Sequence, residues 1–139
     1  MTSLILILSL SGALFAQNPL APTPSASACL VCEKMDKIQA EADENEVTAA
    51  RTLADYLETA EFSKSAEIRK KEFTKVLPLA ARLVEKDDQF DIAQILVSIK
   101  DTDKKLFDET VKQQPEKARK RLNHWEQKMR KQMDKGEEP

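Results

Sequence analysis

Glycine is nearly absent from this chain, and this scarcity constrains the fold more than any other feature. Only two glycines occur among 139 residues. Sheet proteins use glycine at hairpin turns and bulges, whereas helices are weakened by it, so the deficit favours helices. Aromatic residues make up only 5% of the chain and charged residues 33%. We therefore expect a thin helical bundle, with an aliphatic core and wide solvated faces.

The chain starts with an apolar run from Leu4 to Phe15. This run is shorter than the roughly 20 residues that a bilayer-spanning helix needs, and it ends near small residues, as a secretory signal peptide does. We predict a signal peptide over residues 1–16, cleaved after Ala16, with Ala13 as the alternative site. An uncleaved anchor or a buried helix is the competing interpretation. Cleavage predicts export to the periplasm or the extracellular space.

A segment rich in proline, alanine and serine follows the apolar run. Residues 17–28 contain three prolines and one large apolar side chain. Such a segment cannot bury enough surface to offset its ordering entropy, so we predict a disordered linker. The all-α domain is then residues 29–135, and residues 136–139 form a disordered tail. Cys29 lies well beyond the apolar run, which argues against a lipid anchor.

Aliphatic residues recur at three- and four-residue steps, which predicts five or six helices. Two boundaries stay open in the sequence: the polar run 43–46 either breaks a helix or continues it, and Pro78 predicts a kink or a division into two shorter helices. A short helix is expected to be capped by Asp101 or Thr102. The longer helices are predicted over residues 29–42, 47–60, 65–86, 90–99 and 115–134.

The inward positions follow from the same periodicity. The stretch 90–99 is the most apolar part of the expected domain, so we predict that it forms the most buried helix. Leu30, Val47 and Met133 are also assigned to the apolar faces of their helices. The predicted core consists of Leu53, Leu57, Val76, Leu77, Leu83, Phe90, Ile95, Leu96, Ile99, Phe107, Leu122 and Trp125.

Cys29 and Cys32 form the one short motif that could carry chemistry. Two cysteines at a helix start either close a small disulfide or present a reactive thiolate, because the helix N-terminus favours the charged form. Thioredoxin-type enzymes place this motif after a strand, whereas a proline-rich linker precedes it here. A structural or idle disulfide is therefore expected in an exported protein. With His124 as the only histidine, no metal site or cofactor is predicted.

The net charge of −2 conceals a strong asymmetry. Residues 33–61 hold nine acidic and three basic side chains, whereas residues 112–135 hold nine basic and three acidic ones. The simplest interpretation is that these two segments pair within the molecule, while the remaining bases solvate the last helix. The alternative is a face for an anionic partner, made of Lys117, Arg119, Lys120, Arg121, Lys128, Arg130 and Lys131.

Two other partners fit the basic segment less well. Peripheral membrane contact through residues 115–134 would place Leu122, Trp125 and Met129 in the lipid interface. Nucleic acid is disfavoured, because an exported protein is separated from it.

No catalytic signature occurs in the chain: it has no glycine-rich phosphate loop, no HExxH and no nucleophile elbow. The hypothesis is therefore an exported, non-enzymatic binding or structural protein, whose charged helix faces contact a macromolecular partner, by preference a protein. The competing hypothesis is a small thiol-redox or metal-handling protein that uses Cys29 and Cys32.

Overall fold

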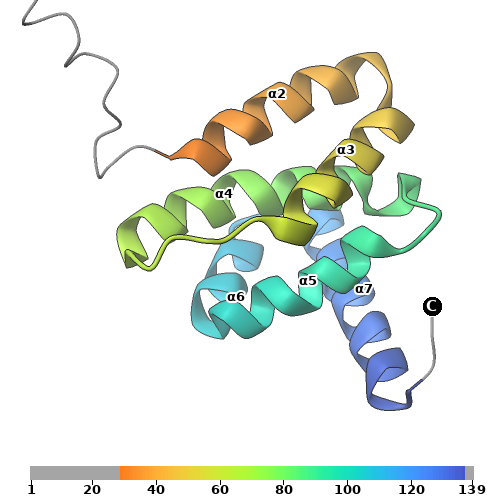
Figure 1. Cartoon of the computed structure of the whole chain (residues 1–139). Helices are drawn as coiled ribbons and strands as arrows, with labels where there is room; N and C mark the ends of the chain where they lie inside the picture. Colours follow the sequence, from red (N-terminus) through yellow and green to blue (C-terminus); the bar gives the residue numbers. More distant parts are fainter. Residues whose placement is uncertain (1–28, 137–139) are drawn as a thin grey trace, which may run out of the picture.

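The computed structural model describes residues 29–136. Over this range the protein contains six α-helices, one 3-10 helix and no strand (Figure 1), which confirms the predicted all-α bundle. The predicted signal peptide and linker, and the last three residues, lie outside the described range. The elements are α2 (Leu30–Glu44), α3 (Glu46–Thr59), α4 (Ala66–Leu83), η2 (Val84–Lys86), α5 (Asp91–Thr102), α6 (Lys104–Lys112) and α7 (Glu116–Asp134).

α4 is the central helix of the fold. It packs against every other helix, whereas α2 packs mainly on α3 and α4, and α7 mainly on α4, α5 and α6. In Figure 1, α2 accordingly lies on one side of α4, and α5, α6 and α7 lie on the other. The acidic helix α2 is therefore separated from the basic helix α7 by the middle helix, whereas α3 also packs on α5.

Asn45 decides the open question at the first boundary. Its backbone is extended, with φ −154° and ψ 105°, so the helix cannot run through it. The Asn45 amide donates to the carbonyl of Glu41 at 2.8 Å, which closes α2. Its side-chain oxygen accepts from the Thr48 amide at 3.1 Å, which caps α3. The first two helices are therefore separate, and α3 folds back beside α2 (Figure 1).

Pro78 does not divide the third predicted segment. α4 is one helix of 18 residues that continues past Pro78 to Leu83, and the 3-10 helix η2 follows directly. Proline removes one backbone hydrogen bond and crowds the preceding turn. Here the proline is exposed, while Leu77 and Leu79 on either side are buried. Tertiary packing on both sides thus holds the helix together, and the alternative of two shorter helices is wrong.

The boundary between α5 and α6 lies later than predicted. Thr102 is the last residue of α5, and its hydroxyl donates to the carbonyl of Ser98. Asp103 is the N-cap of α6, and its carboxylate accepts from the Leu106 amide at 3.0 Å. The predicted caps Asp101 and Thr102 are therefore wrong, because both residues belong to the preceding helix.

Most of the predicted core is buried, with three exceptions, and three residues that were assigned to apolar helix faces outside this core are exposed. Phe90, Ile95 and Trp125 are only half-buried and pack against the rim of the core. Leu30, Val47 and Met133 are 66%, 59% and 51% exposed. Each of these three residues lies in the first or last turn of its helix. The buried predicted positions are Leu53, Leu57, Val76, Leu77, Leu83, Leu96, Ile99, Phe107 and Leu122.

Candidate functional site

α7 divides its basic residues between two faces. Leu122, Glu126 and Met129 are buried and mark the side that packs on the domain. A residue advances by about 100° around an α-helix, so Arg119 and Arg130 fall beside this buried side, whereas Arg121 falls between it and the lysines. The predicted lysines fall on the opposite side and are exposed. The seven predicted basic residues therefore do not form a single surface.

The arginines of α7 contact the rest of the domain. Arg130 donates to Glu126 at 2.7 Å and to Asp101 at 2.9 Å, and these hydrogen bonds raise the pKa of its guanidinium. Arg121 forms an ion pair with Glu85 at 3.3 Å. Arg119 is half-buried, with no ion pair among the described residues. Arg121 and Arg130 thus attach α7 to its neighbours, which leaves them poorly placed for a partner.

The outer side of α7 and its C-cap carry a stripe of lysines, interrupted between Lys120 and Lys128, which we call the lysine face: Lys117, Lys120, Lys128, Lys131 and Lys135. All five are exposed. They fall within an arc of about 80° and span about 27 Å along the helix axis. His124 is exposed on the same side and lies edge-on to the ring of Trp125.

The lysine face makes few contacts with its own chain. Lys120 pairs with Glu116 at 2.8 Å, but both side chains are more than two-thirds exposed. The Lys128 ammonium lies 4.7 Å from the centre of the Trp125 ring. Within residues 29–136, the other three lysines form no ion pair. Most of the positive charge on this face is therefore solvated and open to a partner.

The acidic helices do not neutralise this face, contrary to expectation. Asp36 pairs with Lys75 at 2.8 Å. Asp43 and Glu46 both pair with Arg82 at 2.9 Å. These bases belong to α4, which packs on both acidic helices and on α7. The predicted pairing of residues 33–61 with residues 112–135 is therefore wrong, because α4 supplies the cations itself.

The apolar side of α7 is not open to lipid in this fold. Leu122 and Met129 are 0% and 1% exposed. Insertion of this side into a membrane would require α7 to leave the core. In the described part of the chain, no helix has both the length and the apolar character needed to cross a bilayer.

Cys29 and Cys32 are joined as a disulfide at the start of α2, with their Cα atoms 5.2 Å apart. Cys29 is the N-cap, and its sulfur accepts from the Cys32 amide at 3.1 Å. Both cysteines are partly exposed and line a surface hollow of about 440 Å³ with Thr74, Lys70, Lys71 and Lys75 of α4. Among residues 29–136, no cluster of three or more histidine, cysteine or carboxylate side chains could hold a metal ion.

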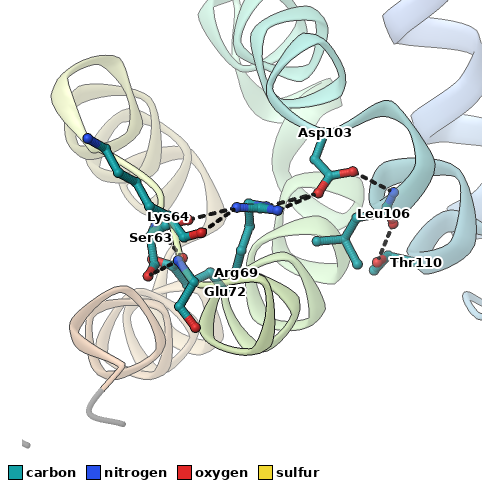
Figure 2. Close-up of polar contacts among 8 residues, drawn as sticks. Ser63, Lys64, Arg69, Glu72, Asp103, Leu106 and Thr110 are labelled. Atoms are coloured by element: carbon teal, nitrogen blue, oxygen red, sulfur yellow. Dashed lines mark hydrogen bonds and ion pairs between the residues drawn. The ribbon is translucent and has the colours of Figure 1, made fainter. Parts of the chain in front are cut away.

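A network around Arg69 holds the loop between α3 and α4 (Figure 2). The Arg69 guanidinium donates to the Ser63 carbonyl at 3.1 Å and forms an ion pair with Asp103 at 2.9 Å. Glu72 is buried and accepts from the Ser63 amide at 2.8 Å. Burial raises the pKa of this carboxyl. Both charged groups are occupied by the protein's own loop, which indicates a structural role and not a ligand site.

A second hollow, of about 340 Å³, lies between α3, α5 and the end of α7. Leu57, Ile95 and Met133 are among its apolar lining, and Glu58 and Asp91 are among its acidic residues. Burial, together with the charges of Asp87, Glu58 and Asp55, raises the pKa of Asp91. This hollow was not predicted, because its residues come from helices far apart in the sequence.

Comparison of the chain with known protein families, curated proteins and solved structures finds no match. The function is therefore inferred from the chain's own residues.

Proposed function

We propose that this chain is an exported, non-enzymatic binding protein, and that the lysine face of α7 holds an acidic protein partner. The observation that carries the proposal is the separation of charge types on α7. Its arginines are half-buried, two of them in ion pairs with neighbouring elements, while its five outer lysines make a single ion pair, Lys120–Glu116, with the described chain. A solvated stripe of one sign attracts a surface of the opposite sign.

The geometry of the stripe favours a helical protein partner. Its lysines fall into two groups with steps of three or four residues, Lys117–Lys120 and Lys128–Lys131–Lys135, and His124 lies midway between the groups. An acidic helix presents its carboxylates at the same three- and four-residue steps. Proteins that bind nucleic acids commonly use arginine side chains in bidentate hydrogen bonds to bases and aromatic rings that stack on bases. On α7, Arg121 and Arg130 are engaged within the domain, and Trp125 is half-buried under Lys128.

Two features support export. The apolar run near the start of the chain has the length of a signal-peptide core. The Cys29–Cys32 disulfide is typical of an oxidising compartment, such as the periplasm or the extracellular space. Expression of the full chain with a C-terminal tag, followed by fractionation and N-terminal sequencing, tests this part. Recovery of an uncleaved protein from the cytosol would contradict it.

The binding site is tested with two triple variants of equal charge. The first, Lys117→Gln/Lys128→Gln/Lys131→Gln, removes charge from the lysine face. The second is the matched control, with exposed lysines on α2, the α3–α4 loop and α6 changed instead: Lys37→Gln, Lys64→Gln and Lys104→Gln. Each variant is titrated at low salt with a glutamate-rich helical peptide, with anionic vesicles and with duplex DNA.

We expect the first variant to lose peptide affinity, and the control to retain it. Exposed ion pairs contribute about 0.2–1 kcal/mol each, so three lost pairs predict a weakening of at least about threefold. Equal losses in the two variants would show that the lysine face is not the site. Tighter binding of vesicles or DNA than of the peptide, lost in the first variant alone, would assign the face to a different class of partner.

A further inference from the structure

The disulfide at the start of α2 is poorly suited to a purely structural role. It joins residues three apart and therefore constrains a single helical turn, and the stabilisation by a cross-link falls as the loop that it closes becomes shorter. It is also partly exposed, whereas structural disulfides that resist reduction are protected from attacking thiols. A disulfide in this position is therefore better suited to react with thiols than to stabilise the fold.

The two sulfur atoms are not equivalent. Cys29 is the N-cap of α2, so its sulfur lies where the helix dipole favours negative charge. It already accepts a hydrogen bond from the Cys32 amide. Both effects stabilise a thiolate on Cys29 and make it the better leaving group when the disulfide is attacked. Cys32 is therefore the sulfur expected to receive an incoming thiolate.

The surroundings of the disulfide select the charge of the attacking group. Lys70, Lys71 and Lys75 line the same hollow as the two cysteines. Lys75 is paired with Asp36, whereas Lys70 and Lys71 form no ion pair within the described part of the chain. A hollow with a surplus of positive charge raises the local concentration of anions.

We propose that Cys29–Cys32 is a thiol–disulfide exchange site for anionic thiols, that is, thiols that carry carboxylates close to the sulfur. The first thiolate attacks Cys32, the Cys29–Cys32 bond breaks, and a mixed disulfide forms on Cys32 while Cys29 leaves as a thiolate. A second thiolate attacks the sulfur of the first and releases Cys32. Two thiols are thereby oxidised to one disulfide, the protein gains two electrons, and the two thiol protons are taken up by Cys29 and Cys32.

The test measures the rate at which three small thiols reduce the disulfide of the full chain at low salt. Reduced glutathione is anionic, 2-mercaptoethanol is neutral and cysteamine is cationic, and each rate is expressed per concentration of thiolate. The variant Lys70→Gln/Lys71→Gln removes the unpaired charges of the hollow. Lys104→Gln/Lys112→Gln removes the same charge from exposed positions on α6 and serves as the control.

We expect glutathione to react fastest and cysteamine slowest. The hollow variant should slow glutathione by about threefold to tenfold, as loss of two nearby charges predicts, and leave 2-mercaptoethanol unchanged. The control should behave like the unmodified chain. Alkylation and mass spectrometry of the trapped intermediate should find glutathione on Cys32. Equal rates for the three thiols, an equal effect of both variants, or glutathione on Cys29 alone would overturn the proposal, without bearing on the lysine face.

Discussion

The Arg69 network offers the sharpest test of how this bundle is held together. The substitution Arg69→Met keeps most of the aliphatic length of the side chain and removes its hydrogen bonds. In the structure, Nε and Nη2 both lie 2.9 Å from one carboxylate oxygen of Asp103. Nη1 donates to the carbonyls of Ser63 and Lys64 at 3.1 and 3.3 Å. One side chain therefore links the α3–α4 loop to the start of α6 (Figure 2).

The expected cost follows from burial. Hydrogen bonds to charged groups contribute about 1.5–3 kcal/mol each when shielded from water. The side chains of Arg69 and Asp103 are 20% and 23% exposed, so water screens part of this energy. In the Arg69→Met variant, the Asp103 carboxylate still accepts a hydrogen bond from the Leu106 amide, so its charge is not left without a partner. We expect a loss of about 2–3 kcal/mol in the free energy of unfolding, or roughly 10 °C or more in melting temperature for a domain of this size.

Urea and thermal unfolding, followed by circular dichroism, measure this loss. Arg119→Met is the matched control, because Arg119 has a similar partial exposure but no ion pair among the described residues, and its effect should stay within about 0.5 kcal/mol. A double-mutant cycle with Asp103→Asn should give a coupling of about 1 kcal/mol. If Arg69→Met unfolds like the unmodified protein, or if the coupling is zero, the loop is held by other contacts and the reasoning fails.

Three further outcomes are expected. Asn45→Ala should cost about 1 kcal/mol in urea unfolding, because Asn45 caps α3. Phe107→Ala should cost about 3–5 kcal/mol in the same assay, because the ring is 0% exposed and its removal leaves a cavity. The Leu106 amide and Arg69 lower the pKa of Asp103. The stabilisation by the Asp103 carboxylate is thus fully present above the ordinary pKa of the group. It is lost as the pH falls through the lower pKa of the folded state. Between pH 5 and 2, the free energy of unfolding should accordingly depend less steeply on pH in Asp103→Asn than in the unmodified protein. An unchanged pH dependence would contradict this.

Local sequence rules predicted the helices well, because each helix carries its own periodic signal. The scarcity of glycine and the three- and four-residue steps were sufficient for the fold class and for most of the core. The wrong predictions concern positions where tertiary packing, and not the local sequence, determines the structure. Pro78 stays within one helix because Leu77 and Leu79 are buried on either side. Met133 is half exposed because it lines an open hollow with residues of α3 and α5.

The candidate sites were predicted less completely, for two different reasons. The separation of the lysines from Arg119 and Arg130 was already present in the sequence, since the helical period places these two arginines beside the packed side. The period places Arg121 next to Lys128, and only its ion pair with Glu85 separates it from the lysines. The pairing of Arg69 with Asp103, 34 residues apart, has no local signal. The same holds for the lysines near Cys29, because only the packing of α4 on α2 brings them there.

The central position of α4 has a consequence for how this protein can change over time. Every other helix packs on α4, so native-state amide exchange should be slowest there and should report opening of the whole domain. The outer side of α7, in contrast, contributes almost nothing to that cooperative unit. Substitutions can therefore accumulate on the lysine face, and alter what the protein recognises, at little risk to its folding.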